Sequence, residues 1–504
     1  MHHVIIGNGI AGISTARHLR KLDSDCKITV ISAETEHFWS RTALMYIFMG
    51  HMKYEHTKPY EDWFWPKNRI DLIHKWVERA DAQQKVLYFS DGESLSYDKL
   101  VLATGSQANK FGWPGQDLQG VQGMVSYQDL QAMEAQAPHI RRAVIVGGGL
   151  IGIEMAEMFH ARHIPVTFLV REESFWNKVM PPEESAMINR EIQRTEGIDL
   201  RLTTELDEII GNQEGWVKAV RTKSGEVIDC EFVGLTAGVH PNLALAESLG
   251  VETNRGFLVD EYLQTSVPDV YAAGDCSELR QPAPGRRGVE AIWYTGKLQG
   301  PVLAQTLTGQ PTPYHQGLYF NSAKFLDIEW QTYGSVNAQP AEQEAQLYWE
   351  HPDGRKAIRL VYDREQGRIL GFNLMGIRFR QDVCLAWIEA EAPIEQVLSK
   401  LDRANFDPEF FPTYEKALVE TYQAQTGREV SLARVSVRGL TLTALAWIGA
   451  AVLLLLASLL IPGEVLRGLV QGLAGMVLLV GLVKAIELLY QGFSQGFGRL
   501  SLAG

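Results

Sequence analysis

The stretch VIIGNGIAGISTARHL, residues 4–19, decides the fold. Its apolar start predicts a β-strand, its glycines a tight turn, and its remainder a helix; Gly7, Gly9 and Gly12 are spaced as GxGxxG. In such a turn the first glycine allows the sharp bend, the second lets backbone approach a pyrophosphate, and the third permits close helix packing. The N-terminus of the helix then offers free amide groups to phosphates. The stretch therefore predicts a dinucleotide-binding fold.

The same strand, turn and helix pattern occurs twice in the chain. The first copy continues into KITVISAE, which ends on Glu34, an acid placed to accept hydrogen bonds from ribose hydroxyls. The second copy is RRAVIVGGGLIGIEMAEMF, residues 141–159, and its partner strand is IPVTFLVRE, residues 164–172. Its glycines are Gly147, Gly149 and Gly152. We expect two nucleotides with their reactive rings together; the alternative is a pair of purely structural glycine turns.

Composition narrows the class of protein. The 504 residues are enough for three or four domains, and the net charge of −13 argues against nucleic acid as a partner. The four cysteines are far apart, without CxxC or metal-ligand spacing, so we expect buried thiols, a reducing compartment and no metal site. The start MHHVIIGNG runs directly into a strand, so we expect no signal peptide.

Three further segments extend the pattern over roughly residues 1–330. They are YDKLVLATGS (97–106), GLTAGVHPN (234–242) and TSVPDVYAAGDCSE (265–278). In this order they resemble the two-dinucleotide-binding-domain flavoproteins, the superfamily of pyridine nucleotide–disulfide oxidoreductases. The resemblance implies an α/β fold with two Rossmann-like domains, FAD in the first and NADH or NADPH in the second. It also implies an α+β interface domain after them.

The resemblance carries over residue by residue to a cofactor-binding set. Asp275 corresponds to the acid that binds the ribityl chain, although an aspartate there can also be only a helix cap. Trp293 or Tyr294 corresponds to the contact that covers the flavin, with a core aromatic as the alternative. The implied set is Gly7, Gly9, Ala11, Gly12, Glu34, Arg41, Val77, Ala103, Thr104, Gly105, Gly147, Gly149, Ile151, Gly152, Glu154, Arg171, Gly238, Gly274, Asp275 and Trp293.

The segment after the first acid lacks a cysteine, so we expect no disulfide reductase. Its FWSRTALMY resembles the Y-x-R/K-P-x-L-S stretch of rubredoxin and ferredoxin reductases, nitrite reductase flavin domains and apoptosis-inducing factor. Thr42 and Met45 depart from that stretch. Arg41 takes its basic position, and Glu154 matches the glutamate that follows the second GxGxxG. We hypothesise an Arg41–Glu154 catalytic pair beside the flavin; the alternative is two ordinary surface charges.

The choice between NADH and NADPH stays open. Val170 and Arg171 resemble the NADPH pattern, in which the arginine pairs with the 2′-phosphate and Lys178 assists. Glu172 opposes this interpretation, because a neighbouring acid repels a phosphate.

The last third of the chain predicts an interface domain and a tail. Residues 314–425 alternate apolar strands with a helix around Ala386 to Leu401; this pattern resembles the superfamily's C-terminal interface domain, and the resemblance implies dimer formation or carrier docking. From Gly439 to Gly463 there is no charged residue, and 465–483 is a second apolar run. We expect a transmembrane hairpin, with a buried helical pair or interfacial anchor as alternatives. The predicted boundaries are 1–112 and 241–313 for FAD, 113–240 for NAD(P)H, 314–425 for the interface, 426–438 for a linker, 439–490 for the hairpin and 491–504 for the tail.

The leading hypothesis is a membrane-anchored, FAD-dependent NAD(P)H oxidoreductase that reduces a quinone. Basic residues flanking the hairpin predict a cell membrane or organelle inner membrane, with the catalytic domains facing the cytoplasm. One alternative is a reductase of a small electron-carrier protein such as ferredoxin or rubredoxin. Another is a slow redox sensor resembling apoptosis-inducing factor. The predicted partners are NAD(P)H, the quinone or carrier protein, the lipid bilayer and a second copy in a homodimer.

Overall fold

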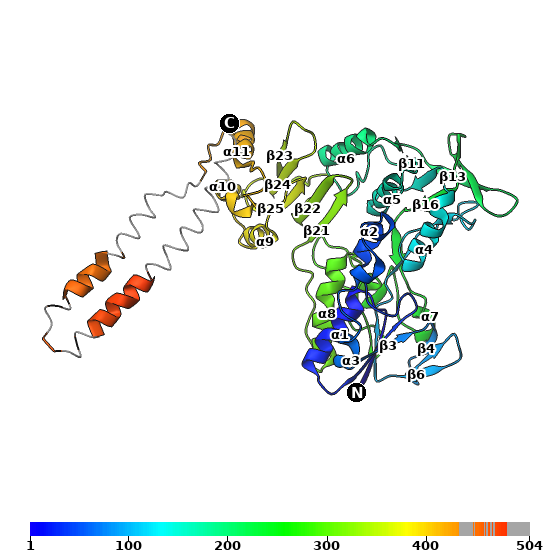
Figure 1. The fold of residues 1–504 in the computed structure, drawn as a ribbon, viewed down its shortest axis with the longest axis horizontal. Coiled ribbons are helices and arrows are strands. Elements are labelled where there is room, and N and C mark those ends of the chain that lie inside the picture. The colour runs from blue at the N-terminus through cyan, green and yellow to red at the C-terminus, as the bar shows by residue number, and fades with distance from the viewer. Residues whose placement is uncertain are drawn as a thin grey trace. The chain divides into compact units, whose positions relative to one another are not determined.

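The computed structural model describes residues 1–432 and, beyond them, 447, 449–457, 459, 462–463, 466 and 469–480. The chain divides into two compact units. The first comprises Met1–Trp330 with Asn337–Gln339, and the second comprises Gln331–Val336 with the residues from Pro340 onward (Figure 1).

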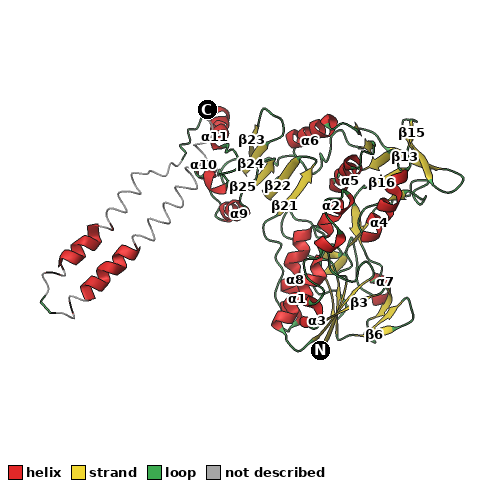
Figure 2. Cartoon of the chain, viewed as in Figure 1, coloured by secondary structure: helices red, strands yellow, loops and turns green. Residues whose placement is uncertain are grey.

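The first unit begins with a five-stranded parallel sheet in the order β19-β7-β1-β2-β3. The strands are β1 (His2–Ile6), β2 (Lys27–Ser32), β3 (Ile70–His74), β7 (Lys99–Leu102) and β19 (Val270–Ala272). Helices α1 (Ile10–Leu22) and α8 (Trp293–Leu307) pack against each other along one side of these strands (Figure 2). Gly300 permits this approach, because a Cβ there would lie 2.4 Å from the Cβ of Ser14.

A second five-stranded parallel sheet has the order β12-β11-β10-β16-β9. Its strands are β9 (Val121–Gln122), β10 (Ala143–Val146), β11 (Val166–Leu169), β12 (Ile198–Arg201) and β16 (Phe232–Leu235). The helices of this part are α4 (Tyr127–Gln136), α5 (Leu150–Ala161) and α6 (Pro182–Arg194). Strands β10, β11 and β16 are fully apolar or nearly so and are buried throughout, as parallel sheets covered on both faces require. The two dinucleotide folds expected from the glycine motifs are both present.

Smaller elements complete the first unit. An antiparallel pair, β8 (Ser106–Ala108) and β17 (Val239–Pro241), joins the segments that connect the two folds. Two small antiparallel sheets have the orders β4-β5-β6 and β13-β14-β15. The remaining elements are β4 (Val77–Asp81), β5 (Val86–Phe89), β6 (Ser94–Ser96), β13 (Leu206–Gly211), β14 (Val217–Thr222), β15 (Val227–Asp229), β18 (Phe257–Val259), β20 (Ser277–Leu279), β21 (Phe320–Phe325), η1 (Arg41–Ala43), α2 (Leu44–Phe48), η2 (Tyr54–Thr57), α3 (Phe64–Lys67), η3 (Ala137–His139) and α7 (Ala246–Leu249).

The second unit is an α+β arrangement. The chain passes from one unit to the other inside β22 (Ile328–Gly334). Strands β23 (Glu344–Glu350), β24 (Ala357–Asp363) and β25 (Ile369–Met375) then pair in antiparallel fashion. The helical elements that follow are α9 (Gln381–Glu389), α10 (Ile394–Ser399), η4 (Leu401–Ala404) and α11 (Glu415–Thr426).

The C-terminal stretch requires a correction. Half of the predicted hairpin, residues 439–490, lies outside the described residues. Among the residues that are described, no helix is both long and apolar enough to cross a bilayer. The predicted localisation in a cell or organelle membrane, facing the cytoplasm, is therefore wrong.

Candidate functional site

The first glycine turn has one position that is open to a ligand and two that the fold itself requires. Gly7 has φ +113°, and a Cβ there would lie 2.0 Å from the carbonyl oxygen of Ala103. A Cβ on Gly12 would lie 2.1 Å from the carbonyl oxygen of Gly7. At Gly9, the N-cap of α1, a Cβ would meet nothing within 4 Å. The turn therefore leaves space beside the N-terminus of α1, where a pyrophosphate fits.

The carboxyl ends of β1, β7 and β19 bring several predicted residues together, because these strands are parallel neighbours. A Cβ on Gly274, just after β19, would lie 2.9 Å from the Cβ of Ala11 in α1. Thr104 and Gly105 follow β7, and the Thr104 hydroxyl donates a 2.8 Å hydrogen bond to the carbonyl of Asn242. These residues line one edge of the sheet, where parallel α/β sheets bind ligands.

Asp275 lies at this same edge. Burial raises the pKa of its carboxyl group, and a hydrogen bond from Ser106 and the positive charge of Arg41 offset only part of that effect. The Ser106 hydroxyl donates to Oδ2 at 3.0 Å, while Oδ1 has no hydrogen-bond partner among the described residues. A half-buried carboxylate with one free acceptor oxygen fits a ligand that carries hydroxyl groups, such as a ribityl chain.

Arg41 pairs with Glu34, not with Glu154 as hypothesised. Its Nη1 and Nη2 donate to Oε1 and Oε2 of Glu34 at 2.8 and 2.5 Å, and Nη1 also donates to the carbonyl of Val125. The reason is local: Glu34 follows β2 and Arg41 opens η1 seven residues later, so the planar guanidinium meets the carboxylate in two-pronged geometry. The backbone N–H of Tyr127 donates to Oε1 of Glu34 at 2.8 Å.

The second glycine turn repeats the geometry of the first. Gly147 has φ +121°, and a Cβ there would lie 2.7 Å from the carbonyl oxygen of Thr236. A Cβ on Gly152 would lie 2.2 Å from the carbonyl oxygen of Gly147, whereas one on Gly149 would meet nothing within 4 Å. Gly149 is the N-cap of α5, and Ile151 lies in the first turn of this helix. This turn therefore offers a second open place for a pyrophosphate.

Helix α5 carries two acids on one face, three residues apart. Glu157 is buried and accepts a 2.7 Å ion-pair contact from the ammonium group of Lys324 in β21. Its other oxygen, Oε2, is buried without a hydrogen-bond partner. Burial, with the charge of Glu157 second, raises the pKa of Glu154 to about 7. Sequence reasoning missed Glu157 and Lys324, because nothing local connects residues 167 positions apart.

The remaining predicted residues have diverse surroundings. Val77 begins β4 and is buried in the core of the first fold. Gly238 has φ +89° and accepts a hydrogen bond from the backbone N–H of Asn109 at 3.0 Å. Trp293 opens α8, its ring centroid 5.4 Å from that of Tyr294, and the ammonium group of Lys297 lies 5.0 Å from the Trp293 ring.

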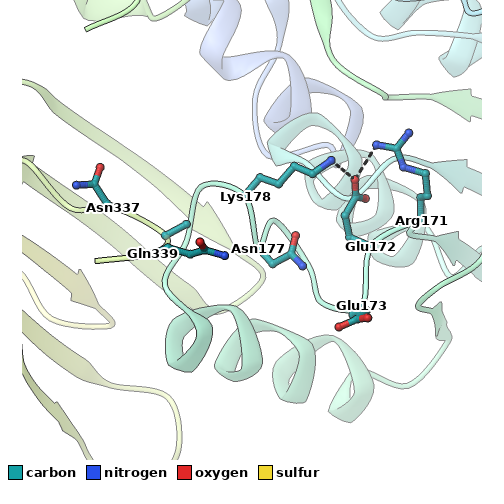
Figure 3. A pocket seen from close by; sticks show the side chains of 8 residues that line it. Arg171, Glu172, Glu173, Asn177, Lys178, Asn337 and Gln339 are labelled. Atoms are coloured by element: carbon teal, nitrogen blue, oxygen red, sulfur yellow. Dashed lines mark hydrogen bonds and ion pairs between the residues drawn. The ribbon is translucent and has the colours of Figure 1, made fainter. Parts of the chain in front are cut away.

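Arg171 and Glu172 come two and three residues after the end of β11 and border an open cavity of about 640 Å³ (Figure 3). Oε1 of Glu172 accepts hydrogen bonds from Nη2 of Arg171 at 2.9 Å and from Nζ of Lys178 at 3.0 Å. The lining residues are Arg171, Glu172, Glu173, Asn177, Lys178, Asn337, Ala338 and Gln339.

Comparison with known proteins identifies the family. A model of the pyridine nucleotide-disulphide oxidoreductases matches residues 1–300. The chain belongs to this family. It is therefore an oxidoreductase that uses FAD and NADH or NADPH.

Three members and neighbours illustrate the relationship. Nitric oxide reductase FlRd-NAD(+) reductase of Shigella dysenteriae is 34% identical over 314 residues, which is 62% of this chain and 80% of that protein. The assimilatory nitrate reductase electron transfer subunit of Bacillus subtilis is 28% identical over 371 residues, 73% of this chain; the match spans about half (47%) of that relative. A ferredoxin reductase structure from Rhodopseudomonas palustris has a TM-score of 0.68 at 23% identity, covering 74% of this chain and 91% of that one, which shows a shared fold.

The cysteines of this pyridine nucleotide-disulphide oxidoreductase have the properties of structural residues. All four are buried and unpaired. Burial raises the pKa of Cys230 to about 12, and it also raises the pKa of Cys276, which directly follows Asp275. A thiol needs to ionise to act as a nucleophile. These side chains are therefore poorly suited to disulfide exchange.

The high pKa of Glu154 predicts a pH-dependent stability. Below pH 4.5 the carboxyl is protonated in both states, whereas between 4.5 and about 7 only the folded protein holds the proton. The free energy of unfolding should therefore fall as pH rises through this window, by about 3 kcal/mol, and stay level above it. Urea unfolding at pH 5 and pH 8 should show this loss in the natural protein relative to Glu154→Gln. An equal difference between the two proteins at both pH values would contradict the assignment.

Proposed function

We propose that this protein is an NAD(P)H-dependent flavoprotein reductase that delivers electrons to a small electron-carrier protein of the rubredoxin or ferredoxin type. The observation that carries this proposal is a compact unit that combines two dinucleotide folds but whose thiols stay protonated because they are buried. Electrons then leave the flavin directly and not through a cysteine pair. The Shigella relative supports the choice of acceptor, since it is named as a reductase between NAD(+) and FlRd.

The cofactor-binding roles are part of the proposal, and the geometry of the two turns supports them. Bound FAD supplies the redox chemistry, because it accepts a hydride from a nicotinamide and releases electrons singly or in pairs. Gly9 and Gly149 leave room for the two pyrophosphates. Asp275 accepts hydrogen bonds from hydroxyl groups of the ribityl chain with its free oxygen. Arg41 orients Glu34, whose carboxylate can accept further hydrogen bonds from the ribose hydroxyl groups.

Glu154 has a different proposed role from the one expected. Without Arg41 as a partner, and beside the charged Glu157, it holds a proton near neutral pH. A two-electron donor that feeds one-electron acceptors releases one proton per nicotinamide oxidised. We propose that Glu154 takes part in moving this proton at the second dinucleotide fold, because burial and, second, the charge of Glu157 raise its pKa to about 7.

The acceptor preferred at first, a membrane quinone, has no support in the comparisons. The relatives favour the carrier-protein alternative, and neither a lipid bilayer nor a homodimer finds support among them. The redox-sensor alternative remains an outcome that the following experiment distinguishes.

Anaerobic stopped-flow measurement tests the proposed acceptor. The FAD-loaded protein is reduced with NADH or NADPH and then mixed with oxidised rubredoxin, with oxidised ferredoxin, or with a soluble quinone analogue as the control. We expect at least one carrier protein to reoxidise the flavin many times per second, and at least tenfold faster than the quinone at equal concentration. Faster reoxidation by quinone would contradict the proposal. A long-lived reduced flavin with every acceptor would favour a sensing role.

A further inference from the structure

The cavity after β11 occupies the position at which dinucleotide folds distinguish NADH from NADPH. In such folds an acid near the end of the second strand binds the ribose hydroxyls of NADH, or an arginine accommodates the 2′-phosphate of NADPH. Here both residue types are present, since Arg171 and Glu172 are adjacent and line the same cavity of about 640 Å³. The question is which of the two side chains has a hydrogen-bonding group free to bind the nucleotide.

The two cations are already engaged by Glu172. Figure 3 shows Arg171 and Lys178 reaching its carboxylate from two sides, with donor–acceptor distances of 2.9 and 3.0 Å to the same oxygen, Oε1. Oε2 has no hydrogen-bond partner among the described residues. Burial by itself would raise the pKa of Glu172, but the hydrogen bonds from both cations outweigh it and lower the pKa. Glu172 is therefore an ionised acceptor with one free oxygen.

The rest of the cavity also favours hydroxyl donors. Arg171 and Lys178 are balanced by Glu172 and Glu173, so the four charged side chains of the lining sum to zero. Asn177 lines the same cavity, and its buried Oδ1 has no hydrogen-bond partner. Free acceptor oxygens bind the two hydroxyl groups of a ribose. A phosphate at neutral pH has negative charge and only acceptor oxygens, so it cannot donate hydrogen bonds to them.

A 2′-phosphate entering the cavity has to compete with Glu172. The side chains of Arg171 and Lys178 are 61% and 71% exposed, so they are free to turn from the carboxylate to the phosphate. This move leaves the Glu172 carboxylate, only 23% exposed, unpaired beside a second anion. Like charges a few ångströms apart repel each other more strongly where water is partly excluded.

We propose that Glu172 selects NADH over NADPH in this protein. The proposal rests on the proposed oxidoreductase function and adds the identity of its electron donor. Glu172 keeps both cations occupied and presents Oε2 to the ribose of NADH. Arg171 becomes a phosphate-binding residue only when the carboxylate charge is removed.

The test compares Glu172→Gln with Glu173→Gln, which removes the same charge from the same cavity without breaking a contact to Arg171 or Lys178. The second-order rate constant of flavin reduction is measured anaerobically with NADH and with NADPH on the FAD-loaded proteins. No electron acceptor is present, so failure of the carrier-protein hypothesis leaves this measurement unaffected. The flavin absorbance spectrum verifies that each variant has folded around its cofactor.

We expect the natural protein to prefer NADH. Glu172→Gln should raise the NADPH-to-NADH ratio at least tenfold, whereas Glu173→Gln should change it less than threefold. Adding Arg171→Ala to Glu172→Gln should reverse most of that gain, because Arg171 then no longer binds the phosphate. A natural preference for NADPH would overturn the proposal, and so would equal ratios in the two glutamine variants or an unchanged ratio in Glu172→Gln.

Discussion

Gly9→Ala should fold normally and yet lose tight FAD binding, whereas Gly7→Ala should fail to fold. At Gly9 the backbone has φ −70°, which any residue adopts, and a Cβ meets no protein atom within 4 Å. The added methyl group instead occupies the space proposed for the pyrophosphate, so we expect FAD affinity to fall at least a hundredfold. Titration of FAD into the cofactor-free protein, followed by flavin fluorescence, measures this loss.

Gly7 differs because the fold itself needs the glycine. Its φ of +113° strains any other residue, at a cost of about 1–3 kcal/mol, and its Cβ would also overlap the backbone of Ala103. Since domains are stable by only about 5–15 kcal/mol, we expect little folded protein. Gly149→Ala is the matched control: it adds the same methyl group to the second turn and should leave FAD affinity unchanged while weakening NAD(P)H. FAD binding by Gly9→Ala at natural affinity would contradict the proposed pyrophosphate position.

Asp275→Asn and Asp275→Ala are expected to change stability and FAD binding in opposite directions. Burial raises the pKa of Asp275, so without cofactor its charged form is disfavoured. Removing the charge should raise the free energy of unfolding of the cofactor-free protein at pH 7 by roughly 1 kcal/mol. Asparagine still presents an oxygen to a hydroxyl group, whereas alanine presents none. We therefore expect FAD affinity to fall less than tenfold in Asp275→Asn and at least a hundredfold in Asp275→Ala.

Urea unfolding and FAD titration measure the two effects independently. Asp275 caps no helix, since strand β20 follows it; if its role were only structural, both variants would lose stability and would bind FAD with similar affinity. That pattern would remove Asp275 from the cofactor site. The stability difference between Asp275→Asn and the natural protein should shrink as pH falls, because burial raises the pKa of Asp275 and the folded protein then binds a proton more readily than the unfolded chain.

The sequence predicted the fold well where local spacing determines structure. Both glycine turns have the expected strand before and helix after, because the motif encodes backbone geometry directly. The segments KAIRLVYD and GRILGFNLMG contain β24 and β25, whose apolar side chains are mostly buried. The single helix expected around residues 386–401 is instead α9 and α10, interrupted before Pro393, since proline restricts the preceding residue.

Sequence reasoning was least successful for long side chains and distant pairs. The motif located Arg41 but not the direction of its guanidinium group, which the nearby Glu34 determines. The Lys324–Glu157 pair exists only because β21 packs against α5. The predicted membrane location depended on the uncharged run from Gly439 to Gly463 and its basic flanks, and half of the predicted hairpin lies outside the described residues.

The strand order of the first sheet imposes a sequence of events during synthesis. Its strands β1, β7 and β19 are neighbours, yet they end at residues 6, 102 and 272, and α8, which packs on α1, ends at residue 307. The second sheet lies within residues 121–235. A nascent chain therefore exposes an unfinished first sheet on the ribosome while the inserted fold is already complete. The nascent chain should therefore bind FAD only once roughly 300 residues have emerged. The inserted fold, which is completed earlier, should be the first part to become protected from proteases.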